Sequence, residues 1–99
     1  MQKKYTIKFH PKALEELSSL DGSLKVLVKK QIEKLQTSPK LGEELGNKHG
    51  YDLTGYRKMY VAKKSVRIVY SIHEEIISVE IIAIGKREDF EVYRTASKR

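Results

Sequence analysis

Apolar and polar residues alternate in residues 4–9 and again in residues 56–61, 66–72 and 76–84. Because successive side chains of a strand point to opposite faces, this alternation predicts β-strands that are each buried on one face. The links between the last three strands are only a few residues long, so these strands are expected to form an antiparallel meander. The first strand is able to lie beside the fourth at a sheet edge, although the sequence does not fix the strand order.

Helical spacing replaces alternation between the first two predicted strands. Leucines three residues apart follow Pro11, which suits the first turn of a helix, and Gly22 is expected to end that helix. Ser23 is expected to cap a second helix, whose apolar stripe needs a sheet to cover it. Residues 39–55 contain several glycines and little periodicity, which predicts a long loop, and a short terminal helix is expected over residues 88–96.

The order of these elements predicts the fold class. It is β-α-α-β-β-β-α, which indicates a single α+β domain over residues 1–99. In this domain a helical hairpin and a short C-terminal helix pack on a four-stranded, mostly antiparallel sheet. Alternation assigns these residues of the last strand to the helix-facing core: Ile77, Val79, Ile81 and Ala83.

The composition narrows the class of protein. Lys and Arg number 20 against 13 Asp and Glu, and the net charge of +7 favours a polyanionic partner such as nucleic acid or the ribosome. Cysteine is absent, which excludes disulfides, thiolate metal sites and cysteine nucleophiles. No apolar run approaches the ~20 residues of a membrane span, and no signal peptide is evident. A cytoplasmic protein without a membrane partner is therefore expected.

All five arginines lie in the second half of the chain. Between Leu53 and His73 there is no acidic residue, whereas cations and tyrosines are interleaved. Basic side chains neutralise phosphate, and tyrosine rings stack on unpaired bases. Alternation places part of this set on the sheet face away from the helices: Lys58, Tyr60, Arg67, Ser71 and Glu80. The pattern fits a solvated sheet face and a phosphate-binding face equally well.

Short motifs in the second half carry a family resemblance. Residues 67–70 are Arg-Ile-Val-Tyr, residues 85–88 are Gly-Lys-Arg-Glu and residues 91–93 are Glu-Val-Tyr. Together with the Ile-rich strand between them and Leu-Thr-Gly-Tyr-Arg-Lys at 53–58, they resemble the RelE group of the RelE/ParE toxin superfamily. Residues 1–38 fit the β-α-α opening of that family by pattern only.

The resemblance implies a toxin of a type II toxin–antitoxin pair that enters the ribosomal A site and cleaves mRNA there. Such a toxin needs no metal or other cofactor, because the RNA 2′-OH attacks its adjacent phosphate while side chains move protons and stabilise charge. By matching position, Arg67 and Arg87 would contact the scissile phosphate, and Tyr93 would stack on or orient the substrate base. Lys58 matches one of the two active-site lysines of the family. The residues expected to bind RNA around them are Arg57, Tyr60, Lys63, Lys64 and Lys86.

The sequence departs from the family pattern at Tyr60, where the family has its second active-site lysine. The general base therefore stays open between two residues. Lys58 is flanked by cations, which are expected to lower the pKa of its ammonium towards that of a useful base. Tyr60 would serve only if a cationic surrounding strongly depressed the pKa of its phenol. Arg87 stays charged at any ordinary pH, so it is assigned to charge stabilisation first and acid catalysis second.

Two other classes of function remain alternatives. A ParE-like toxin would inhibit DNA gyrase without RNA chemistry, although that branch generally lacks the pair matched here by Arg87 and Tyr93. A non-catalytic nucleic-acid-binding or corepressor module would need only the cationic sheet face. The partners that the resemblance implies are a cognate antitoxin, the ribosome with its mRNA, and operator DNA bound by a toxin–antitoxin hetero-oligomer. Among the acidic residues, the pairs Glu15–Glu16 and Glu43–Glu44 are expected to be solvated.

Overall fold

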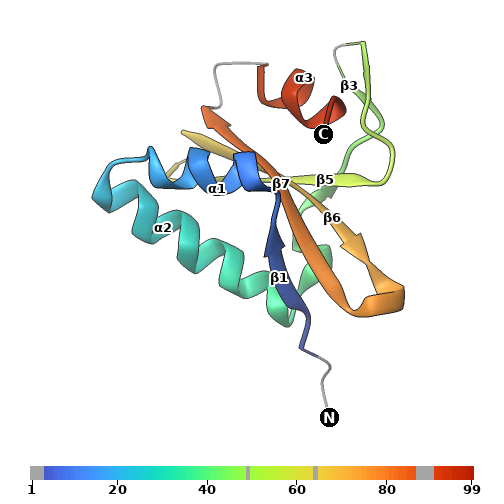
Figure 1. Ribbon diagram of the computed structural model, residues 1–99, viewed down its shortest axis with the longest axis horizontal. Coiled ribbons are helices and arrows are strands. Elements are labelled where there is room, and N and C mark those ends of the chain that lie inside the picture. The colour runs from blue at the N-terminus through green and yellow to red at the C-terminus, as the bar shows by residue number, and fades with distance from the viewer. Residues whose placement is uncertain (1–3, 49, 64, 87–90) are drawn as a thin grey trace.

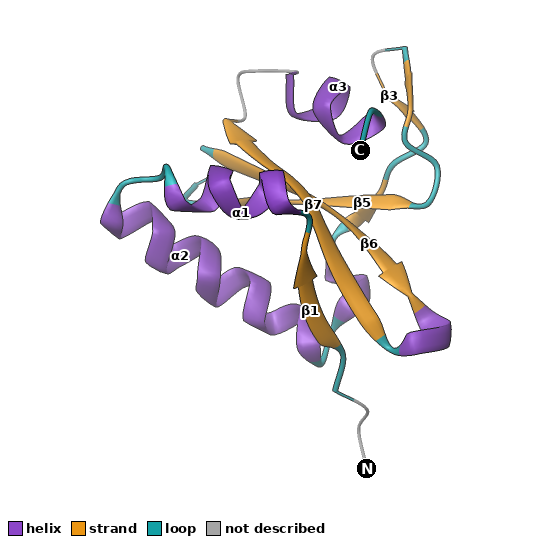
Figure 2. Cartoon of the chain, in the orientation of Figure 1, coloured by secondary structure: helices purple, strands orange, loops and turns teal. Residues whose placement is uncertain are grey.

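The computed structural model describes residues 4–48, 50–63, 65–86 and 91–99. Its helices and strands follow in the order β1 (Thr6–Phe9), α1 (Pro11–Ser18), α2 (Gly22–Glu33), β2 (Glu43–Glu44), β3 (Asn47–Lys48), β4 (Tyr51–Asp52), β5 (Tyr56–Val61), β6 (Val66–His73), β7 (Ser78–Lys86) and α3 (Glu91–Ser97). Short 3-10 helices lie between them: η1 (Lys34–Gln36), η2 (Pro39–Leu41) and η3 (Glu74–Ile76). The α1–α2 hairpin lies along one side of a twisted sheet, and α3 lies apart from it (Figures 1 and 2). Among the described residues, no helix is long and apolar enough to cross a membrane.

The main sheet has the strand order β1-β7-β6-β5-β2. β1 runs parallel to β7, with Thr6 opposite Ser78, and the other neighbours are antiparallel. The predicted α+β class is confirmed, and so is the place of the first strand beside the last at a sheet edge. The described sheet has five strands where four were predicted, because β2 adds to β5 with Glu43 opposite Lys58. β3 and β4 form a separate two-stranded ribbon, so the predicted loop over 39–55 contains short strands.

A buried tyrosine fixes the segment before β2 against β5 and β6. The Tyr70 hydroxyl accepts a hydrogen bond from the Gly42 amide at 2.8 Å and donates one to the Pro39 carbonyl at 2.8 Å. Glycine is required at position 42, because a Cβ there would lie 2.8 Å from the Tyr70 hydroxyl and would collide with the carbonyl of Lys58. This close approach brings β2 beside the strand that carries Lys58.

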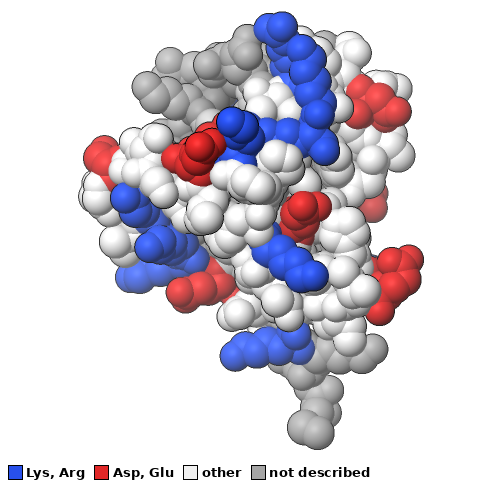
Figure 3. Space-filling view, in the orientation of Figure 1, with Lys and Arg blue, Asp and Glu red and all other residues white. Residues whose placement is uncertain are grey.

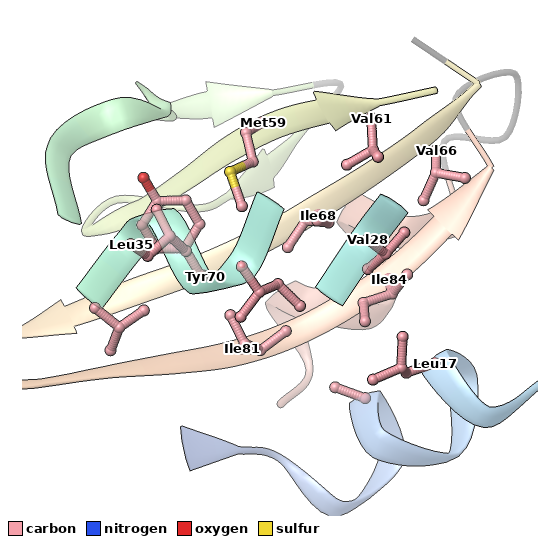
Figure 4. Packing of buried hydrophobic residues seen from close by; sticks show 13 residues of the cluster. Leu17, Val28, Leu35, Met59, Val61, Val66, Ile68, Tyr70, Ile81 and Ile84 are labelled. Atoms are coloured by element: carbon pink, nitrogen blue, oxygen red, sulfur yellow. The ribbon is translucent and has the colours of Figure 1, made fainter. Parts of the chain in front are cut away.

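The helical hairpin covers one face of the sheet and closes the larger core, as predicted from its apolar stripe (Figure 4). Val28 of α2 and Leu35 just beyond it meet Ile68 and Tyr70 of β6 and Ile81 of β7. All five side chains are fully buried. Their burial removes apolar surface from water and supplies the main stabilisation of the sheet–helix packing.

The turn between α1 and α2 corrects two predictions. α1 ends at Ser18, several residues before Gly22. Gly22 is instead the first residue of α2, and Asp21 caps that helix by accepting a hydrogen bond from the Leu24 amide at 3.1 Å. The Ser23 hydroxyl donates to the same carboxylate at 2.9 Å, so Ser23 supports the cap and does not form it. Asp and Ser are both favoured caps, and local sequence alone does not choose between neighbours.

A β-bulge in β7 changes the face that its later residues take. The register between β6 and β7 shifts between Val69 and Tyr70, which leaves Ile82 as an extra residue. Beyond the bulge the alternation is inverted, so Ala83 faces away from the helical hairpin and Ile84 joins the core beneath it. The prediction of Ala83 as a helix-facing core residue is therefore wrong, although its side chain is fully buried.

The second face of the sheet is covered by α3. Its inward side chains form a smaller core with parts of β6, β7 and the loops before β5: Leu45, Leu53, Val69, Ile82, Ala83, Val92, Tyr93 and Ala96. The sheet face away from the helical hairpin was predicted to be polar. It is apolar beneath α3 and polar only beside that helix. Ile77, also assigned to the core, lies instead in the turn before β7, with a left-handed backbone (φ 49°).

Candidate active site

Strands β5 and β6 and helix α3 bring four side chains together. In the pairing of β5 with β6, Tyr60 lies opposite Arg67, and Lys58 shares the face of Tyr60 two residues away. Tyr93 of α3 lies against Arg67 from the covering helix. We call these four residues the site cluster. All four are residues that the sequence analysis singled out, and the structure places them in one group.

The cations and aromatic rings of the site cluster are in direct contact. The Lys58 ammonium donates a hydrogen bond to the Tyr60 hydroxyl at 3.0 Å. The Arg67 guanidinium carbon lies 4.6 Å from the centre of the Tyr93 ring and 5.4 Å from the centre of the Tyr60 ring. Both distances are within the range of a cation–π interaction, so both rings help to fix the guanidinium.

Arg67 is buried without a full set of hydrogen bonds. The residue is 5% exposed, and its Nε and Nη1 atoms have no hydrogen-bond partner among the described residues. Burying a guanidinium in this way is costly unless an anion pairs with it. Arginine presents its donors as a planar fork that matches a phosphate group. The two unused donors of Arg67 therefore suit a phosphate.

The surroundings of Tyr60 lower the pKa of its phenol from 10.0 to about 8. The largest cause is the hydrogen bond from the Lys58 ammonium, which stabilises the phenolate. Burial opposes the shift, and the positive charges of Lys58 and Arg67 add to it. The structure thus contains the cationic surrounding that the sequence analysis required of Tyr60 as a base.

The pKa of the Lys58 ammonium moves in the direction opposite to the prediction. Burial lowers this pKa, but the hydrogen bond to Tyr60, the nearby phenols and the Glu43 carboxylate together raise it above its ordinary value. The Glu43 carboxylate lies 3.7 Å from the ammonium. The expectation of a lowered pKa is wrong, because the direct partner of Lys58 is a phenol that becomes an anion. Burial also raises the pKa of the Tyr93 phenol, so that Tyr93 keeps its proton.

Arg57, which was expected to bind RNA, does not join the site cluster. It lies on the other face of β5 from Lys58, by the alternation of the strand. Its guanidinium donates hydrogen bonds to the Gly42 carbonyl at 2.7 Å and to the Glu44 carboxylate at 3.2 Å. These contacts hold β2 against β5, which is a structural role.

The other cations expected to bind RNA lie at or near strand ends. Lys63 is exposed in the turn between β5 and β6. Lys86 is the last residue of β7, and its backbone lies opposite Val66. Lys64 and Arg87 lie outside the described residues, so the structure does not place the second arginine of the family motif.

Ser71 and Glu80 share a sheet face as predicted, but they form a separate polar group with His73. They lie opposite each other in the β6–β7 register. The Ser71 hydroxyl is 3.0 Å from the His73 Nε2 atom, which is 3.6 Å from the Glu80 carboxylate. This group is at the end of β6 remote from Arg67, so it is not part of the site cluster.

A groove of about 540 Å³ lies between α2 and β5, with Tyr60 in its wall. The same groove is lined by Lys30 of α2, by Lys34 of η1 and by Lys63. The half-exposed side chain of Leu27 adds an apolar patch to it. The sequence does not predict that Lys30 and Lys34 lie near Tyr60, because this depends on how α2 and η1 pack beside β5.

Comparisons with known proteins agree with this fold. Residues 7–96 match the family model described as ParE-like toxin of type II bacterial toxin-antitoxin system. The mRNA interferase toxin RelE of Escherichia coli K12 is 30% identical over 95 residues, which cover 96% of each chain. The structure of a double-arginine mutant of E. coli RelE in the free state matches with a TM-score of 0.80 and 28% identity over 97% of each chain. A chain of the intact E. coli RelBE toxin–antitoxin complex matches with a TM-score of 0.67 and 26% identity, covering 83% of this chain and 95% of that chain.

The fold and these matches define the class of protein, which is the toxin of a type II toxin–antitoxin system. The chain belongs to the ParE-like toxin family, and within that family it is a RelE-type toxin.

Proposed function

We propose that this toxin is a ribosome-dependent endoribonuclease that cleaves mRNA in the ribosomal A site. The observation that carries the proposal is the buried Arg67 guanidinium, which has two donors without partners among the described residues. A phosphate group would satisfy both donors once the side chains that bury them move aside. The similarity to proteins named mRNA interferase RelE supports RNA as the source of that phosphate.

The reaction that this site suits is a transesterification within RNA. The 2′-OH attacks the adjacent phosphorus, the bond to the 5′-oxygen breaks, and the products carry a 2′,3′-cyclic phosphate and a 5′-OH. Arg67 binds the phosphate oxygens and stabilises the charge that grows on them in the transition state. The Lys58 ammonium adds a second positive charge beside Tyr60. By resemblance, Arg87 joins Arg67 at the phosphate, so the scheme needs no metal ion.

The position of Tyr93 refines the role that the resemblance implies. Its ring is 1% exposed and packs 4.6 Å from the Arg67 guanidinium carbon. A ring in this place orients the guanidinium and offers little surface to a substrate base. We therefore assign Tyr93 as a positioning residue for Arg67.

The proposal includes a cognate antitoxin that silences the toxin in the cytoplasm. The similar structures include the RelBE complex of E. coli and an E. coli RelE mutant bound to a RelB peptide. An antitoxin bound over the site cluster would keep the toxin from the ribosome and its mRNA. We also propose that the toxin–antitoxin hetero-oligomer binds operator DNA.

Primer extension on a translated mRNA with purified ribosomes tests this function. The wild type is compared with Arg67→Ala, Arg87→Ala and Arg94→Ala. Arg94 is an exposed residue of α3 outside the proposed site, and its replacement removes the same charge. Cosedimentation with ribosomes shows whether each variant still binds, and circular dichroism shows whether it is folded.

We expect EDTA-resistant cuts within A-site codons for the wild type and for Arg94→Ala. Cleavage should fall at least about a hundredfold in Arg67→Ala and Arg87→Ala, which is typical for loss of a transition-state charge contact. Intact mRNA in every sample, together with inhibition of DNA gyrase, would favour the ParE-like alternative. Undiminished cleavage by Arg67→Ala would show that the phosphate is bound elsewhere.

A further inference from the structure

The geometry of the site cluster bears most directly on which residue acts as the general base of the proposed reaction. We propose that Tyr60, as its phenolate, takes the proton from the attacking 2′-OH, while Lys58 holds the phenolate and does not itself act as the base. This inference rests on the proposed function and names the residue that starts the reaction.

The contact between Lys58 and Tyr60 divides the two roles. The Lys58 ammonium donates a hydrogen bond to the Tyr60 oxygen at 3.0 Å, so Lys58 already carries the proton that a base must lack. Its raised pKa keeps the ammonium charged. The oxygen that can lose a proton is therefore that of Tyr60. With a pKa of about 8, Tyr60 is partly phenolate at pH 7.5.

The place of Tyr60 also suits a base that must meet the substrate. It lies opposite Arg67 in the β5–β6 register, so a phosphate bound by that guanidinium would lie beside the phenol. Tyr60 is half-buried and lines two hollows of the surface, one of about 540 Å³ beside α2 and one of about 270 Å³ beside β2. Lys58 and Tyr93 are more deeply buried, at 9% and 1% exposed.

Most charged and titratable groups that face Tyr60 stabilise its anion. Lys58 lies on the same strand, Arg67 on β6 and Tyr93 on α3, while the Glu43 carboxylate of β2 reaches Lys58 and not the phenol. The groove beside α2 adds three further cations: Lys30, Lys34 and Lys63. The hydrogen bond from Lys58, together with the positive charges of Lys58 and Arg67, explains why a tyrosine is able to act at near-neutral pH.

The step balances without a further reactant. The Tyr60 phenolate takes the 2′-OH proton as the 2′-oxygen bonds to phosphorus, and the bond from phosphorus to the 5′-oxygen breaks. The leaving 5′-oxygen takes a proton from solvent. Tyr60 then returns its proton to solvent, so no net proton is consumed.

The test is the pH dependence of cleavage under kcat/KM conditions, which reports the ionisation of the free toxin. For the wild type, cleavage of mRNA on ribosomes should rise about tenfold per pH unit and level off near pH 8. Tyr60→Phe should cleave about 10²–10⁴-fold more slowly and should lose this rise, because a general base contributes that factor. Tyr5→Phe is the matched control: it removes the same atom from a hydroxyl that bonds Glu74 near the opposite edge of the sheet.

A second variant separates proton transfer from packing. With 3,5-difluorotyrosine at position 60, the ring and hydroxyl are kept but the phenol is more acidic, so the plateau should begin at a lower pH. Titration by the ultraviolet absorbance of tyrosinate adds a readout that needs no ribosome. One of the six tyrosines should ionise near pH 8 in the wild type and be missing from that range in Tyr60→Phe.

The outcomes distinguish this inference from the proposed function. If the wild type cleaves mRNA and Tyr60→Phe cleaves within twofold of it with the same pH profile, Tyr60 is not the base and the endoribonuclease function stands. An unmoved profile with difluorotyrosine would overturn the inference as well. If the wild type cleaves nothing on the ribosome, the proposed function itself fails.

Discussion

Two polar side chains of β6, Arg67 and Tyr70, are buried on opposite faces of the sheet. On the helix side, the Tyr70 hydroxyl both accepts and donates a hydrogen bond, to Gly42 and Pro39. On the α3 side, Arg67 has two donors without partners among the described residues. A satisfied buried group stabilises the fold, whereas an unsatisfied one costs free energy that a ligand can recover. Tyr70 is therefore a structural residue, and in our proposal Arg67 is a binding residue.

For Tyr70→Phe, we expect the free energy of unfolding to fall by about 1–3 kcal/mol, because the Gly42 amide and the Pro39 carbonyl both lose a buried partner. Chemical denaturation measures the change. Tyr5→Phe, at an exposed hydroxyl, should leave the free energy of unfolding close to that of the wild type. Equal effects of the two substitutions would contradict the structural role of Tyr70.

For Arg67→Met, we expect the activity to fall while the stability is kept or increases. Methionine fills a similar space beside Tyr93 without a buried charge, so the free energy of unfolding should stay the same or increase. Cleavage of mRNA should fall at least about a hundredfold, because the phosphate loses its guanidinium. Denaturation and primer extension on the same preparations provide the comparison. A large loss of stability would show that Arg67 is mainly a structural residue.

At the scale of elements, α3 depends on its surroundings. It is a seven-residue helix, too short to be stable alone, and it contributes Tyr93 to the site cluster. Arg99, just beyond α3, makes two hydrogen bonds to the Glu16 carboxylate of α1, at 2.9 and 3.1 Å. Glu16 also accepts a hydrogen bond from the Ile84 amide at 3.1 Å. The expectation of a solvated Glu16 is therefore wrong, since this residue links α1, β7 and the segment after α3.

Replacing Glu16 should loosen α3 and, through Tyr93, the site. For Glu16→Gln we expect a loss of about 1–3 kcal/mol in the free energy of unfolding, because the Arg99 guanidinium loses a charged bidentate partner. Hydrogen exchange at the α3 amides should become faster. Glu15→Gln is the control, since Glu15 is exposed and pairs with Lys12 at 3.6 Å. Unchanged exchange in Glu16→Gln would mean that packing alone holds α3.

The elements also show what a sequence can and cannot predict. Both ends of β5 follow from alternation, because a half-buried strand has a strict two-residue period. β2 is two residues long and carries no period, and its pairing depends on a contact between Gly42 and Tyr70, which are far apart in the chain. The bulge at Ile82 inverts a pattern that alternation assumes to be unbroken. Such features depend on tertiary contacts.

The candidate site, like the fold, could be predicted only in part from the sequence. Lys58, Tyr60 and Arg67 share a face by alternation, whereas Tyr93 was added by resemblance to the RelE group. Which of Lys58 and Tyr60 holds the proton could not be predicted, because it depends on a hydrogen bond of 3.0 Å and on burial. A count of nearby cations gave the wrong direction for the pKa of Lys58.

At the scale of the whole molecule, positive charge is spread over the surface. In the view of Figure 3, basic side chains recur over the helical hairpin, the strands and the C-terminal region, with acidic side chains between them. The net charge of +7 favours association with a large polyanion without defining a sequence preference. In our account, the site cluster supplies the chemistry, and the surface charge supplies much of the affinity for the ribosome.

Ribosome affinity should therefore fall as salt increases, with a linear relation between the logarithms of affinity and salt concentration. Replacing two lysines of the groove, Lys30 of α2 and Lys34 of η1, as Lys30→Gln with Lys34→Gln, should reduce this slope by about two units. The control is Lys8→Gln with Lys12→Gln, two exposed cations on β1 and α1. Equal slopes for both double variants would contradict a ribosome contact at the groove.

The central claim is that this toxin cleaves mRNA on the ribosome by attack of the 2′-OH. Its most direct test is the chemical identity of the ends of mRNA fragments recovered from ribosomes after incubation with the toxin and EDTA. The account predicts fragments with a 2′,3′-cyclic phosphate at one end and a 5′-OH at the other, formed only when ribosomes are present. Intact mRNA, or fragments with 3′-OH and 5′-phosphate ends, would contradict it.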